Sequence, residues 1–186
     1  MAARLKRPHA AALTLGALAL VAVACAPSDT GPVPSEGVPV ASDGPTRTVG
    51  PAVAQTRADL VRALGTKNLV LQDSQAPFRP PEDERFTTTP RALYQVILPK
   101  APQEGFIVVY EFADPTAAME AATEQAAYLA TGPAKVQSAF GTRHIIRLVG
   151  STVVLYSWVP EGATDAIQPD IQTALETLGT GVVVPS

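Results

Sequence analysis

Hydrophobic positions follow a strand-like pattern in the middle and the second half of the chain. The segment 106–112 is apolar at nearly every position, which predicts a central strand buried on both faces. The segments 92–98, 143–149 and 152–158 are rich in β-branched and aromatic residues and predict three more strands. Short apolar runs at 68–71 and 182–184 are candidates for strands at the sheet edges.

A two-residue turn fixes the expected pairing of the last two long strands. Gly150 and Ser151 fit a hairpin turn with glycine in its first central position. The resulting register places His144 opposite Ser157 and Arg143 opposite Trp158. Because side chains alternate between the two faces, Ile146 and Leu148 should point into the core.

Three helices are predicted from start and stop signals. Thr56 and Asp59 have the spacing of a capping box, with Gly65 placed to end that helix in a left-handed conformation. Asp114, followed by proline, opens an alanine-rich helix that Gly132 and the next proline would close. A third amphipathic segment runs from about 165 to 178.

The order of these elements is helix, strand, long loop, hairpin, helix, hairpin, helix. Strands that follow one another as hairpins favour an antiparallel sheet. We therefore predict an α+β fold, a two-layer sandwich with a sheet of about five strands and the helices on one face.

The connection 72–91 is long for a compact domain, and long connections are often functional. It combines several prolines with two isolated aromatic residues and three consecutive acidic residues. The block of charge is typical of a solvated loop. A calcium site is the less favoured alternative, because consecutive carboxylates do not by themselves converge on one ion. We predict a partner-facing surface here and at the end of the second hairpin, formed by Phe78, Glu82, Asp83, Glu84, Phe86, Arg143 and Trp158.

His144 and Ser157 are the nearest approach to a base and a nucleophile. A serine hydrolase also needs a group that orients the histidine and donors for the oxyanion, and no Gly-x-Ser-x-Gly motif is present. A structural contact between the two is favoured over catalysis. Arg143 beside Trp158 could form a cation–π pair. We predict no catalytic residues.

The N-terminus carries the pattern of an export signal. Basic residues at 4, 6 and 7 precede the apolar segment 10–24, which leads to Cys25. The stretch 18–25, Leu-Ala-Leu-Val-Ala-Val-Ala-Cys, resembles a bacterial lipobox. This resemblance implies a signal peptide at 1–24 and a diacylglycerol on the sulfur of Cys25. Two or three acyl chains would then hold the protein to a membrane.

Two other interpretations of the N-terminus remain open. The apolar segment could be an ordinary cleaved signal with Cys25 as a bystander. A transmembrane helix is disfavoured, because it needs about 20 predominantly apolar residues and this segment is shorter.

Proline and glycine recur through the segment that follows Cys25, which predicts an extended tether at 25–52 ahead of a globular domain at 53–186. Loss of the basic residues of the signal would shift the formal net charge from -3 to -6. This charge argues against a nucleic-acid partner. A single cysteine excludes a disulfide framework, and the sequence offers neither a zinc ligand set nor a phosphate-binding loop, so we predict no metal and no cofactor.

The middle of the chain is similar to small bacterial lipoproteins of uncharacterised function. The similarity rests on a strand ending in Tyr110-Glu111-Phe112, then Asp114 and an alanine-rich helix. It implies a fold and an envelope location, in the cell membrane or outer membrane, but no activity. We expect a non-enzymatic, lipid-anchored domain that contacts another envelope protein. A small-molecule binding or sensing module is the alternative, and a hydrolase ranks third.

Overall fold

A computed structural model describes residues 50–74, 76–161 and 165–185. Cys25, the predicted signal peptide and the tether up to residue 49 lie outside these residues. The helices are α1 (Pro51–Gly65), α2 (Glu84–Thr88), α3 (Pro115–Leu129), α4 (Gly132–Gln137) and α5 (Gln168–Glu176). The strands are β1 (Leu71–Asp73), β2 (Arg91–Val96), β3 (Phe106–Glu111), β4 (Arg143–Val149), β5 (Thr152–Trp158) and β6 (Thr180–Val182).

The strands form one antiparallel sheet in the order β1-β2-β3-β5-β4-β6. This confirms the α+β class, with six strands in the described part of the chain where about five were expected. The central position of β3 is confirmed, since it pairs with β2 and β5. The hairpin register is also as predicted, from Val149 opposite Thr152 to Arg143 opposite Trp158.

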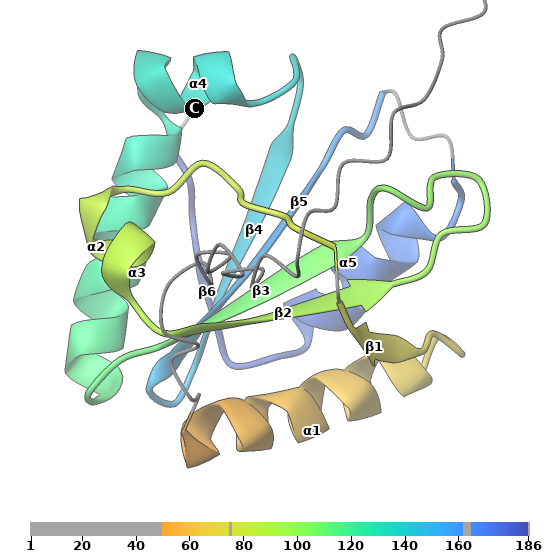
Figure 1. Ribbon diagram of the computed structural model, residues 1–186, viewed down its shortest axis with the longest axis horizontal. Coiled ribbons are helices and arrows are strands. Elements are labelled where there is room, and N and C mark those ends of the chain that lie inside the picture. The colour runs from red at the N-terminus through yellow and green to blue at the C-terminus, as the bar shows by residue number, and fades with distance from the viewer. Residues whose placement is uncertain (1–49, 75, 162–164, 186) are drawn as a thin grey trace, which may run out of the picture. The chain divides into compact units, whose positions relative to one another are not determined.

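The helices cover both faces of the sheet, so the expectation of helices on one face was wrong. Ile107 and Val109 of β3 lie in a core with α1 and α5, whereas Val108 and Tyr110 lie in a second core with α2 and α3. Figure 1 shows α3 on one side of the sheet and α1 on the other. A strand that is apolar at every position needs cover on both faces, because its side chains alternate between them.

The first helix begins earlier than its apparent capping box. Gly50 is the N-cap residue of α1 and gives no side-chain cap. Thr56 lies inside the helix, buried, with its Oγ1 2.8 Å from Oγ1 of Thr152 in β5. The left-handed residue after the helix is Asn68 (φ 57°) and not Gly65. A hydroxyl that was expected to cap the helix therefore joins it to the sheet.

The third helix has its predicted start. Asp114 accepts a hydrogen bond at Oδ1 from the backbone N–H of Ala117, at 2.8 Å. Ala118, Ala121 and Ala122 are fully buried against the sheet, and side chains this small let α3 lie close to the strands. The helix ends at Leu129, and the Gly-Pro pair that was expected to close it begins α4 instead.

The C-terminal strand begins and ends two residues before the apolar run 182–184 that predicted it. β6 pairs with β4 only from Thr180 opposite Leu148 to Val182 opposite Ile146. The remaining residues 183–185 are not part of the sheet. Among the residues that the structure describes, no helix is both long and apolar enough to cross a bilayer.

Candidate functional site

Glu82, in the acidic part of the 72–91 connection, is buried, which contradicts its prediction as a solvated, partner-facing residue. The side chain of Glu82 is 1% exposed. Its Oε1 accepts hydrogen bonds from the hydroxyl of Tyr110, at 2.6 Å, and from Nη1 of Arg91. Nε of Arg79 lies 3.1 Å from Oε2, although not in the direction of a hydrogen bond. Burial and the adjacent carboxylate raise the pKa of Tyr110.

Asp83 and Phe86 also have structural roles. Asp83 is the N-cap of α2 and accepts at Oδ1 from the N–H of Phe86, at 2.9 Å. The Phe86 ring is fully buried, with its centroid 4.6 Å from Tyr110 and 5.4 Å from Phe112. Only Glu84 of the acidic triplet is exposed. The three carboxylates have different surroundings and do not form a calcium site, and the described residues contain no metal-binding cluster.

Phe78 does line a surface hollow. Its ring stacks on Phe106 at 4.5 Å, and with Pro80 and Pro81 it borders a hollow of about 230 Å³. The predicted contact between His144 and Ser157 lies in the same hollow, with Nδ1 2.8 Å from Oγ.

Burial lowers the pKa of His144 and so favours the neutral imidazole. Within the described chain no carboxylate hydrogen-bonds to its other ring nitrogen. In the Ser-His-Asp triad a carboxylate orients the histidine, and the described residues supply no such contact to His144.

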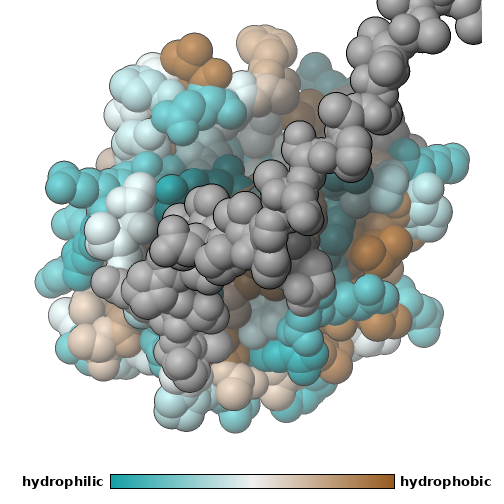
Figure 2. All heavy atoms as spheres, in the orientation of Figure 1, coloured by the Kyte–Doolittle hydropathy of each residue, from teal (hydrophilic) through white to brown (hydrophobic). Residues whose placement is uncertain are grey.

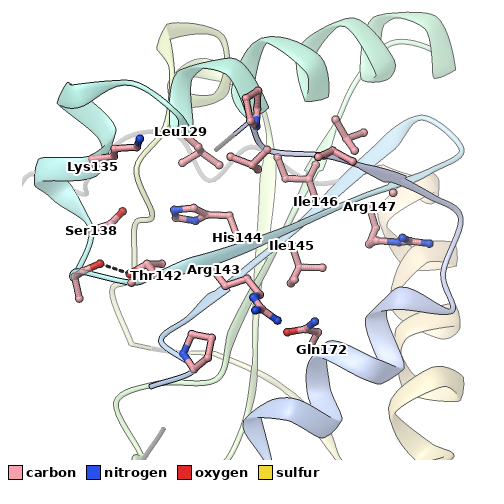
Figure 3. A pocket seen from close by; sticks show the side chains of 18 of the residues that line it. Leu129, Lys135, Ser138, Thr142, Arg143, His144, Ile145, Ile146, Arg147 and Gln172 are labelled. Carbon is pink, nitrogen blue, oxygen red and sulfur yellow. Dashed lines mark hydrogen bonds between the residues drawn. The ribbon is translucent and has the colours of Figure 1, made fainter. Parts of the chain in front are cut away.

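A larger groove of about 860 Å³ adjoins the first hollow at His144. Its walls are Lys135 of α4 with the loop 138–142, the C-terminal residues 181–185, and Gln172 and Glu176 of α5 with residues 160–161. Strand β4 runs between them. Figure 3 shows that His144 lies on one side of β4, near Lys135, while Arg143 and Ile145 lie on the other. The groove therefore opens along the edge of a strand.

That edge of β4 is only partly covered. β6 pairs with β4 at residues 146–148, so residues 143–145 have no strand beside them on this side among the residues described. The exposed Arg143 stands at this uncovered part. Trp158, predicted to be partner-facing, is instead buried and donates from Nε1 to Oε1 of Gln172, at 3.0 Å.

The predicted cation–π pair of Arg143 and Trp158 is not formed. The cation–π contacts of the described residues join Arg57 to Tyr94 and Arg85 to Phe112.

Apolar side chains project from the rim of the groove. Phe140 is 97% exposed, and Val136 and Val183 are each 85% exposed. Phe140 and Val183 line the groove itself. Figure 2 shows apolar side chains projecting at the end of the domain where Figure 1 places α4. Their exposure was not predicted from the sequence, in which Val183 belongs to the expected edge strand 182–184. The local signal for Val136 and Phe140 is their apolar character within a short segment that begins and ends with glycine.

The comparisons with known proteins add no functional assignment. No protein-family model matches the chain, and neither the curated proteins nor the solved structures gave a significant match.

Proposed function

We propose that this protein is a lipid-anchored, non-enzymatic component of the cell envelope, and that its domain binds another envelope protein through the groove beside β4. The observation that carries the proposal is the set of exposed apolar side chains around the groove, led by Phe140 at 97% exposure. The anchor rests on the lipobox-like sequence that ends at Cys25.

An exposed phenylalanine next to a groove is suited to protein binding. Burying such a side chain in a partner would contribute roughly 1.5–3 kcal/mol. Aromatic residues at the centre of an interface often dominate its affinity. Val136 and Val183 extend this apolar surface on two different segments of the chain, α4 and the C-terminal residues.

Site-specific photocrosslinking tests the proposal. A photoreactive phenylalanine analogue replaces Phe140 in the full-length, membrane-attached chain, and crosslinked proteins are identified by mass spectrometry. The matched control carries the analogue at Val70, which is 66% exposed and precedes β1, the strand at the opposite edge of the sheet. We expect one reproducible adduct at position 140 that is missing at position 70 and in a Cys25→Ser form. Equal labelling at both positions, or none, would contradict the proposal.

A small-molecule binding role is the second candidate, and the smaller hollow favours it. The stacked Phe78 and Phe106 offer an apolar wall, and the His144–Ser157 pair offers polar atoms. Trp158, the only tryptophan of the chain, also lines this hollow. Titration with phenol or indole should then change the fluorescence of Trp158, and Phe78→Ala should weaken the response. An unchanged spectrum would count against this role.

A further inference from the structure

We propose that the groove takes an extended acidic segment of a partner protein, which pairs as a short added strand with the uncovered edge of β4. This inference rests on the proposed function and specifies the chemistry of the partner.

The first support is the backbone of β4. In a hairpin with a two-residue turn, the closing pair exchanges both backbone hydrogen bonds, and such pairs alternate along the strands. Val149 and Thr152 are the closing pair, so Val149, Arg147, Ile145 and Arg143 direct their backbone groups toward β5. The N–H and C=O of His144 are then directed toward the other edge, beyond the last residue that β6 covers. An added strand would satisfy both groups.

The second support is charge. Lys135 and Arg143 both line the groove, and in the described part of the chain neither has an acidic partner. Six other described cations are in ion pairs: Arg57, Arg62, Lys67, Arg79, Arg85 and Arg91. On a chain with a formal net charge of -3, the unpaired cations at this groove favour an acidic ligand.

Basic side chains outnumber acidic ones in the lining of the groove. The lining contains Glu161 and Glu176 against three cations, Lys135, Arg143 and Arg147. Arg147 is engaged by backbone carbonyls at the end of α5, including that of Glu176, at 2.9 Å. Glu176 in turn accepts from Nε2 of Gln172, at 2.7 Å. Lys135 and Arg143 are therefore the cations of the lining that are available to bind a ligand.

The geometry also predicts which types of residue the partner segment carries, and in which order along the added strand. Side chains of an added strand alternate between the two sides of the sheet. In an antiparallel pairing, the residue opposite His144 would lie on the Lys135 side, and the next one would lie opposite Arg143 on the other side (Figure 3). The residue before them would meet Ile145. An apolar residue followed by two acidic ones, such as Val-Asp-Glu, matches this order.

Fluorescence anisotropy with synthetic peptides tests the inference, using the full-length chain in detergent micelles. The probe is fluorescein-labelled Gly-Ser-Val-Asp-Glu-Ser-Gly. One control peptide replaces Asp-Glu with Lys-Lys, and the other is N-methylated at the aspartate, which removes the N–H that would bond to the C=O of His144. We expect no binding of the Lys-Lys peptide and an affinity about threefold to tenfold lower for the N-methylated one.

Charge reversal on the protein gives the matched test. Arg143→Glu and Lys135→Glu should each weaken the acidic peptide about tenfold. Lys100→Glu, at an exposed lysine outside the groove, should leave the affinity unchanged. Bound peptide should also slow hydrogen exchange at the amide of His144. Circular dichroism and the milder Arg143→Gln variant separate a lost contact from a lost fold.

Three results would overturn the inference: equal binding of the Lys-Lys peptide, indifference to N-methylation, or equally effective competition by inorganic polyphosphate, which would indicate a general polyanion site. A partner that crosslinks at Phe140 but is unaffected by Arg143→Glu would refute the acidic segment and leave the proposed function standing. If position 140 captures no partner while the acidic peptide binds as expected, the proposed function fails and only the peptide preference stands.

Discussion

Replacing Glu82 with glutamine should destabilise the domain by about 3 kcal/mol. The substitution keeps the shape of the side chain but removes the charge that Arg91 and Arg79 face. Breaking a buried ion pair costs about 3–5 kcal/mol, and the lower end applies because the side chain of Arg91 is 29% exposed. Tyr110 can still donate to the amide oxygen, although a neutral acceptor makes a weaker bond.

Urea denaturation followed by circular dichroism measures this cost. The matched control is Glu84→Gln, two residues away at an exposed position in the first turn of α2, where a change of at most about 0.5 kcal/mol is expected. Tyr110→Phe should cost about 1.5 kcal/mol, and the double variant with Glu82→Gln less than the sum, because both substitutions weaken one hydrogen bond. If Glu82→Gln and Glu84→Gln agree within about 1 kcal/mol, the carboxylate does not stabilise the fold and the reasoning fails.

Two further predictions concern a turn and a titratable side chain. Gly179→Ala should cost about 2 kcal/mol or more, because φ is +37° and an added Cβ would lie 1.9 Å from the carbonyl oxygen of Leu148. Gly65→Ala, with nothing near the added atom, should be neutral or stabilising, and equal melting temperatures of the two variants would contradict this contrast. The lowered pKa of His144 means that the unfolded chain binds the proton more readily, so this residue costs stability as the pH falls below about 6.5. The free energy of unfolding should therefore decline less between pH 7.5 and 5.5 in His144→Gln than in the native chain, and parallel pH profiles would rule this out.

The predictions that succeeded depend on neighbouring residues. The Gly150–Ser151 turn fixed the register of β4 and β5, and with it the contact of His144 with Ser157. Asp114 caps α3 as expected, because capping involves only the first turn of a helix. These features follow from backbone geometry within a few residues, which the order of amino acids specifies directly.

The predictions that failed depend on partners far along the chain. Thr56 looked like a cap, but its hydroxyl meets Thr152, 96 residues away. Glu82 and Phe86 looked solvated in a proline-rich segment, but both pack against Tyr110 in the central strand. A local pattern indicates how polar a segment is. It does not indicate which distant group will pack against that segment in the folded chain.

Periodicity and turn chemistry act locally, so the long helices α1, α3 and α5, the two antiparallel hairpins and the α+β class could be predicted from the sequence, whereas the short helices α2 and α4 were not. The packing of distant segments, in contrast, placed helices on both faces of the sheet and turned Glu82 inward. It also decided that β6 ends before it covers the β4 edge at Arg143 and His144. The groove arises where α4, β4 and the C-terminal residues meet, and the shape of such a junction depends on how distant segments pack against each other.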